Sequence, residues 1–263
     1  MATDSTAICN LSLARMGQEL IDDIDGTDIL EEKCKLLYSQ CLEEVTTMGP
    51  ELGWKFARRR KRLDREEMSI TAIALLTATT VTVTAAHTLV EGDLVVIDDT
   101  TSYDGEYEVL SVTGTTSFTI TATFVATETG TAYWTSSEYS YRYTMPTSLR
   151  IVSVQSGGVE VTDWVREGVF LLTNYSDTDL DIIYVQSITT TTLFPPHFTR
   201  VLVLYLAIAL HYNITQDLKA IQLLAQEYDY AMSKAIAMDE REKYVKEFSS
   251  SWVDIGNKTD TIE

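Results

Sequence analysis

Cysteine and histidine are scarce in this chain of 263 residues, which has three of each. The cysteines are Cys9, Cys34 and Cys41, and an odd number within the first helical stretch of the chain is not a disulfide framework. Cys34 and Cys41 are seven residues apart and share one helix face. The histidines are scattered, whereas a zinc site takes about four ligands. We therefore expect the cysteines to be small residues that face the core, and we expect no metal or cofactor.

Long apolar runs are also missing. The longest, residues 201–210, is far short of the roughly 20 residues that a membrane-spanning helix needs. The N-terminus does not have the basic patch and apolar stretch of a signal peptide. We therefore expect a soluble protein that is made in a cytoplasm and has no membrane contact.

Basic residues are absent from residues 66–141, which contain 11 acidic side chains. Residues 54–65, in contrast, contain seven basic side chains and one acidic one, although the net charge of the chain is −19. An acidic protein does not bind DNA by releasing counterions, so we do not expect specific DNA binding. The compact basic run is more typical of a contact with a protein partner.

Four stretches have the apolar period and the end signals of helices. They cover about residues 4–16, 28–48, 195–213 and 216–244. Asp4 or Ser5 can cap the first, Gly49 and Pro50 stop the second, and two prolines open the third. The third is apolar nearly all round, so we expect it to be central.

Residues 66–138 are rich in Thr and Val and alternate between apolar and polar, which predicts five or six short strands. Turn dipeptides such as Asp104-Gly105 separate these strands. We expect a small barrel or sandwich with a core of Val81, Val83, Leu94, Val96, Tyr107, Val109, Phe118, Ile120 and either Tyr133 or Trp134. Residues 139–187 predict a shorter β segment, with strands near residues 159–164, 169–173 and 180–184.

The predicted fold is therefore α+β: mainly an α-helical bundle of four helices, with a short β segment and an inserted all-β barrel or sandwich module. Residues 1–65 and 139–245 form the helical core, residues 66–138 the inserted β module, and residues 246–263 a C-terminal arm.

The sequence contains no pattern typical of a catalytic site. A Gly-rich phosphate loop, a G-x-S-x-G elbow and an H-E-x-x-H helix are all missing. Adjacent carboxylates such as Asp98 and Asp99 are poorly placed for glycoside hydrolysis, which needs about 5–10 Å across a cleft. We expect that the protein is not an enzyme.

Four stretches stand out as motifs. The first is Ile8-Cys9-Asn10-Leu11-Ser12-Leu13-Ala14-Arg15-Met16-Gly17, and the second is Trp54-Lys55-Phe56-Ala57, followed by basic residues and Leu63. The third is Tyr141-Arg142-Tyr143-Thr144-Met145-Pro146, and the fourth is Thr192-Leu193-Phe194-Pro195-Pro196-His197-Phe198.

In this order, these motifs resemble the head-to-tail adaptor family of tailed phages, which includes the tail tubular protein A of short-tailed phages. The first is similar to the family's opening N-x-A-L-x-x-L-G pattern, with departures at Ser12 and Met16. The second resembles its W-x-F-A signature, the third its Y-x-Y-x-x-P strand, and the fourth the start of its third helix. Residues 66–138 are a departure, because short family members lack them.

The resemblance implies a structural protein of the virion neck, assembled as a homo-oligomeric ring of twelve copies. Such a ring joins the portal protein to the tail nozzle or tube protein. It surrounds the channel through which the genome leaves, and DNA passes without specific binding.

Two segments are expected to contact the portal or a neighbouring subunit. One consists of Trp54, Phe56, Arg58, Arg59, Arg60 and Arg62, for which the acidic residues 18–32 are a candidate partner. The other is the C-terminal arm, with Lys246, Phe248, Trp252 and Val253. For the first segment a second interpretation stays open, in which the aromatic residues fill the local core at a helix end and the basic face is solvated.

Two other functions stay open. The inserted module could recognise a glycan or a decoration protein on the virion surface, although its aromatic residues are spaced like a strand core. The chain could also be a stopper or tail-completion protein of a long-tailed phage. The acidic surplus either keeps the protein in solution or lines the channel so that DNA slides.

Overall fold

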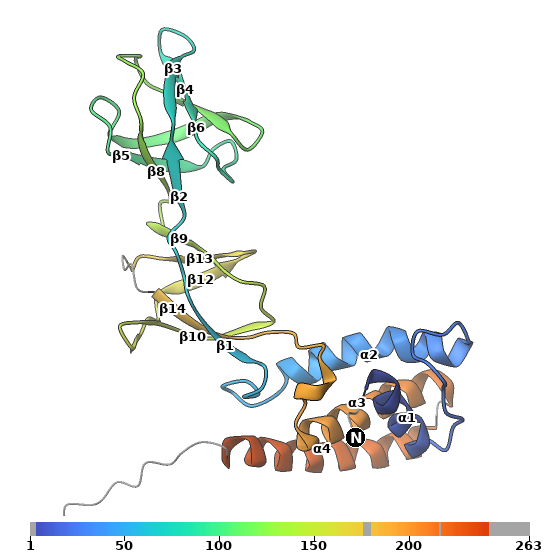
Figure 1. The fold of residues 1–263 in the computed structure, drawn as a ribbon. Coiled ribbons are helices and arrows are strands. Elements are labelled where there is room, and N and C mark those ends of the chain that lie inside the picture. Colours follow the sequence, from blue (N-terminus) through green and yellow to red (C-terminus); the bar gives the residue numbers. More distant parts are fainter. Residues whose placement is uncertain (1–3, 176–179, 216, 242–263) are drawn as a thin grey trace, which may run out of the picture. The chain divides into compact units, whose positions relative to one another are not determined.

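The computed structural model describes residues 4–175, 180–215 and 217–241, which form two compact units. The helical unit contains the residues up to 50, residues 54–56 and the residues from 188 onward. The β unit contains residues 51–53 and 57–187. Both ends of the chain therefore build the helical unit, as the sequence colours show (Figure 1).

The helical unit contains the four helices that the sequence predicts. These are α1 (Ser5–Arg15), α2 (Ile29–Thr47), α3 (Pro196–Ile214) and α4 (Leu218–Arg241), with a 3₁₀ turn, η1 (Thr191–Leu193), before α3. Asp4 caps α1 and accepts a hydrogen bond from the backbone N of Ala7 at 2.6 Å. Asp28 and Glu31 form a capping box at the start of α2. The apolar α3 contacts the three other helices and is the centre of the unit, as predicted (Figure 1).

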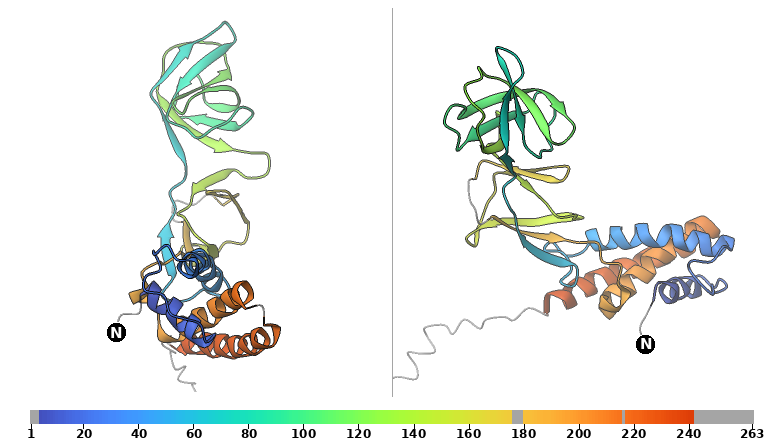
Figure 2. Two further views of the ribbon diagram at one scale, coloured as in Figure 1. Left: turned by 90° about the vertical axis from the view of Figure 1, so that its right-hand side faces the viewer. Right: turned by 45° about the horizontal axis from the view of Figure 1, so that its top comes forward.

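Seven strands of the β unit form one antiparallel sheet that closes into a barrel. They are β2 (Glu67–Ile70), β3 (Ala72–Leu75), β4 (Thr80–Thr84), β5 (Leu94–Asp98), β6 (Gly105–Thr113), β7 (Ser117–Thr121) and β8 (Gly130–Thr135), in the order β2-β8-β5-β6-β7-β4-β3. The two edge strands, β2 and β3, are separated only by Thr71, so one segment pairs at both edges of the sheet (Figure 2). This closure removes the open edges that a flat sheet would expose.

Most of the predicted barrel core is confirmed. Val81, Val83, Val109, Phe118 and Ile120 are buried, and Tyr107 and Trp134 pack against them.

The prediction for β5 is wrong by one residue. Val95 and Ile97 are buried, whereas Leu94 and Val96 are only half-buried. The four residues of this run are all apolar, so their pattern could not say which alternate pair faces inward.

The other seven strands form two antiparallel sheets, here called the sandwich. They are β1 (Arg58–Arg62), β9 (Tyr141–Thr144), β10 (Arg150–Ser156), β11 (Val159–Glu160), β12 (Trp164–Glu167), β13 (Phe170–Thr173) and β14 (Leu180–Val185). One sheet has the order β1-β14-β10-β11 and the other β12-β13-β9. Val154 and Ile182 from the first sheet pack with Tyr143 and Leu171 from the second, and this cluster is the core of the sandwich.

The prediction of a mainly helical bundle with a short β segment is therefore wrong. The described residues form 14 strands in three antiparallel sheets, against four α-helices. Residues 139–187 contain six of these strands, and they recruit Arg58–Arg62 as a seventh. An unbroken basic run lacks the alternation of a strand, and β1 is a strand because all five of its residues pair with β14.

Candidate functional site

The Trp54-Lys55-Phe56 segment lies inside the helical unit, between α2 and the start of α3. The indole of Trp54 is fully buried, and its Nε1 donates to the backbone oxygen of Val45 at 3.0 Å. The Trp54 ring packs edge-on against Phe198, with 5.4 Å between centroids. Phe56 packs against Phe198 at 4.6 Å and against Phe194 at 5.6 Å. This aromatic cluster joins two segments that are about 140 residues apart in the sequence.

Gly49 leaves the space that the Trp54 ring occupies. A Cβ atom at Gly49 would lie 2.2 Å from Trp54 Nε1. In the sequence, Gly49 predicts only the end of α2, and nothing there indicates this close approach.

Lys55 binds the C-terminal end of α4. Its ammonium donates to the backbone oxygen of Asp239, and its backbone N donates to Asp239 Oδ1 at 3.2 Å. The side chain of His197, at the start of α3, lies 4.0 Å from the same carboxylate oxygen. The motif therefore anchors the last described turn of α4 to the start of α3.

These contacts bear on the predicted interface residues. Trp54 has no exposed surface and Phe56 is half-buried, so both contribute to the core of their own chain. This geometry favours the interpretation in which the aromatic residues fill the local core. The segment is, however, a link between α2 and β1 rather than a helix end.

The basic run forms β1, an edge strand of the sandwich. Arg60, Lys61 and Arg62 are exposed, and Arg62 Nε lies 3.6 Å from Asp181 Oδ1 on β14. Arg58 and Arg59 are half-buried, and Arg58 donates to the backbone oxygen of Gly53 at 3.0 Å. Lys and Arg on an edge strand oppose the pairing of further strands. The run thus has a role in the fold in addition to any role in binding.

The other predicted contact residues, Lys246, Phe248, Trp252 and Val253, lie outside the described residues.

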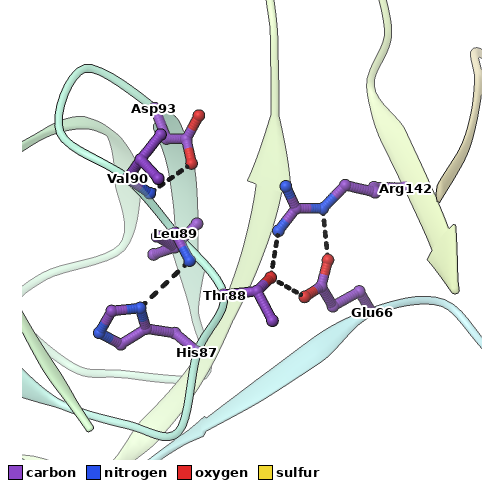
Figure 3. Close-up of polar contacts among 7 residues, drawn as sticks. All are labelled: Glu66, His87, Thr88, Leu89, Val90, Asp93 and Arg142. Carbon is purple, nitrogen blue, oxygen red and sulfur yellow. Dashed lines mark hydrogen bonds and ion pairs between the residues drawn. The ribbon is translucent and has the colours of Figure 1, made fainter. Parts of the chain in front are cut away.

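A buried ion pair lies where the barrel meets the sandwich (Figure 3). Arg142 on β9 pairs through Nε with Glu66, the residue before β2, and their side chains are only 7% and 12% exposed. Thr88 completes the group: its hydroxyl donates to Glu66 Oε1 at 2.6 Å and accepts from an Arg142 NH2 group at 3.0 Å. The backbone N of Glu66 also donates to the backbone oxygen of Arg142 at 2.9 Å. Both charges are therefore paired and hydrogen-bonded, as burial requires.

Aromatic rings enclose the two arginines at this junction. The guanidinium of Arg142 lies 4.9 Å from the ring of Trp134 and 4.3 Å from that of Phe170. The guanidinium of Arg65 lies 3.7 Å from the ring of Tyr133 and 4.7 Å from that of Tyr141. Each arginine thus contacts one ring of the barrel and one from residues 139–175, through attraction between the cation and the ring faces.

The loop from β4 to β5 that carries Thr88 is held by its own polar contacts (Figure 3). His87 Nδ1 accepts from the backbone N of Leu89 at 3.1 Å, and Asp93 accepts from that of Val90 at 2.9 Å. These bonds fix the position of Thr88. The junction could not be predicted from the sequence, because its residues are far apart in the chain and no local pattern links them.

The cysteines are buried and unlinked, as predicted. A hydrogen bond with Cys34, together with burial, raises the pKa of the Cys9 thiol well above its ordinary value. Burial raises the pKa of Cys41 to about 12. Such thiols are poor nucleophiles near neutral pH. Among the described residues, no group of three or more His, Cys, Asp or Glu side chains is arranged to hold a metal ion.

None of the four described helices is both long enough and apolar enough to cross a membrane. A scan of the chain against models of protein families and a search of curated proteins gave no match. The resemblance to the adaptor family therefore depends on the four sequence motifs alone.

Proposed function

We propose that the chain is a structural head-to-tail adaptor of a tailed phage. In this proposal it forms a ring in the virion neck that joins the portal to the tail nozzle and surrounds the DNA exit channel. The observation that carries the proposal is the aromatic cluster of Trp54, Phe56, Phe194 and Phe198. It brings the second and the fourth adaptor-like motif into contact across about 140 residues.

The two other motifs also hold positions on which the fold depends. In the first, the side chain of Asn10 pairs with the backbone of Ile21, donating at 2.9 Å and accepting at 2.8 Å. Ser12 in the same motif donates to the backbone oxygen of Val203 on α3 at 3.0 Å. In the third, Tyr143 is buried in the sandwich core and Arg142 forms the ion pair with Glu66. Residues with such roles are the ones that a shared fold would retain, which supports the resemblance.

The charge of the barrel suits a protein near a DNA channel that must not bind DNA. Residues 66–141 contain no basic side chain, so a barrel close to the channel would repel phosphate. The barrel aromatics Tyr103 and Phe118 are buried in its core, which disfavours the alternative of a glycan-binding surface.

The proposal is tested by co-expressing the chain with the portal protein encoded in the same genome. We expect the two proteins to sediment together and to show an added ring at the tail-side end of the portal by electron cryomicroscopy. A gel-shift assay of the chain with duplex DNA at physiological salt should show no complex. A portal that sediments without the chain would contradict the proposal.

A further inference from the structure

Two helix faces of the helical unit expose apolar side chains in pairs. On α2, Ile29 and Leu36 are 75% and 73% exposed, and on α4, Leu223 and Tyr230 are 68% and 64% exposed. The members of each pair are seven residues apart, which is two helical turns or about 10 Å along the axis. Each pair therefore forms one stripe along its helix, and the two stripes have the same spacing.

The α2 stripe is acidic on balance. Glu32 and Lys33 lie between Ile29 and Leu36 on the same face, and Glu43 lies two turns beyond Leu36; both glutamates are exposed, whereas Lys33 is half-buried. The lysine at position 35 lies on another side of the helix, where it pairs with Asp25 at 2.9 Å.

The α4 stripe is basic. Lys219 is one turn before Leu223, Lys234 is one turn after Tyr230, and Arg241 is two turns after Lys234. All three are exposed. Glu227, an acidic residue of this helix, instead pairs with Arg15 and Arg200.

The charges of both stripes are available to another chain. In the part of the chain that the structure describes, no ion pair involves Glu32, Glu43, Lys219, Lys234 or Arg241. Isolated exposed leucines are common on protein surfaces. The frequency of single exposed leucines does not explain two apolar pairs of equal spacing, one with an acidic and the other with a basic surplus beside it.

The two stripes face different sides of the helical unit. Helix α3 contacts both α2 and α4 and lies between them (Figure 1), and the exposed faces of the outer helices point away from it. A symmetric dimer through either stripe would bring together two surfaces with a surplus of the same charge, which is unfavourable. Contact between two different stripes is heterologous, and such contacts close into rings when the rotation allows.

We infer that the α4 stripe of one copy packs against the α2 stripe of the next copy. The inference rests on the proposed ring, for which it names the contact between subunits. The apolar pairs supply the buried surface, and the lysines and glutamates set the orientation and exclude the symmetric alternatives.

Charge exchange between the stripes tests the inference. One variant carries Glu32→Lys and Glu43→Lys, a second carries Lys219→Glu and Lys234→Glu, and a third carries all four substitutions. Self-association is measured by sedimentation velocity over a range of concentrations, with and without the co-expressed portal. Because the substitutions lie on the surface, circular dichroism melting curves should stay close to that of the wild type.

The first two variants should each need about tenfold more protein to associate, which corresponds to about 1.4 kcal/mol. The third variant should return to wild-type association, because its stripes are again opposite in sign. As a matched control, Glu106→Lys with Glu108→Lys makes the same charge change on exposed residues of the barrel strand β6 and should leave association unchanged.

The inference would be overturned if the first or the second variant associated as the wild type does. It would also be overturned if the third variant did not regain wild-type association. A wild-type chain that stays monomeric both alone and with the co-expressed portal would also overturn the inference. If the wild type associates by these stripes but does not bind the portal, the contact stands and the adaptor proposal fails. The two readouts thus separate the two failures.

Discussion

The helical unit and the barrel build their cores from the sequence in opposite ways. In the helical unit, Ser12 bonds to Val203 across 191 residues, and Trp54 packs against Phe198. The barrel is formed by one continuous segment, residues 67–135, whose strands pair only with one another. The helical unit therefore requires segments from both sides of the β unit. The barrel needs only one continuous segment, so it can be inserted between them with its core intact.

The two regions also differ in how they distribute charge. The barrel has no basic residue, so its outer surface carries charge of one sign. The helical unit carries both signs, with an acidic surplus on the α2 stripe and a basic surplus on the α4 stripe. Barrels that carry charge of one sign repel one another, whereas two surfaces with opposite surplus charges favour ordered contact between copies. The self-association inferred above is therefore expected through the helical unit rather than through the barrel.

The largest expected effect comes from deleting one core aromatic in each region. Trp54→Ala should destabilise the helical unit by about 3–5 kcal/mol, and Phe118→Ala should destabilise the barrel by a similar amount, because each removes a fully buried ring. Hydrogen exchange measured by mass spectrometry should show lost protection in α3 for the first variant and in β7 for the second. If either variant lost protection equally in both regions, the two cores would not be separate.

A smaller effect should follow from Arg142→Met, which tests whether the barrel depends on residues outside its own segment. The substitution leaves Glu66 buried without its partner and should cost about 3 kcal/mol in urea unfolding of the β unit. The double variant Glu66→Leu with Arg142→Met removes both charges and should recover most of this loss. A single variant as stable as the wild type would show that the junction adds nothing to the barrel.

The smallest effect concerns the surface of the helical unit. Arg15 donates to Glu227 at 2.6 Å and Arg200 donates to it at 3.3 Å, and these contacts lower the pKa of Glu227. The ionised carboxylate therefore stabilises the fold above the ordinary glutamate pKa of about 4.3, and this contribution is lost as the pH falls through the lowered folded value.

Because the Glu227 pairs are partly exposed, Glu227→Gln should cost only about 0.5 kcal/mol at neutral pH. In urea titrations, its difference from the wild type should vanish in acid. Glu240→Gln, at an exposed glutamate of the same helix, is the matched control for the substitution itself and should leave the stability at neutral pH close to that of the wild type. A difference for Glu227→Gln that persists in acid would mean that packing, rather than charge, is responsible.

The sequence alone determined the four helices, because a helix is formed by neighbouring residues. The cap at Asp4, the prolines before α3 and the apolar period of each helix are all local signals. Alternation likewise predicted the barrel and the inward side of β4 and β7, where apolar and polar residues alternate clearly.

Only the tertiary structure decided which side of β5 faces inward and that Arg58–Arg62 is a strand. In the first case, all the candidate residues are apolar; in the second, the strand exists because β14 lies beside it. The same holds for the Glu66–Arg142 pair, the space that Gly49 leaves for Trp54, and the different sides on which the α2 and α4 stripes lie. Each of these depends on contacts between distant segments, and such contacts leave no periodic trace in the sequence.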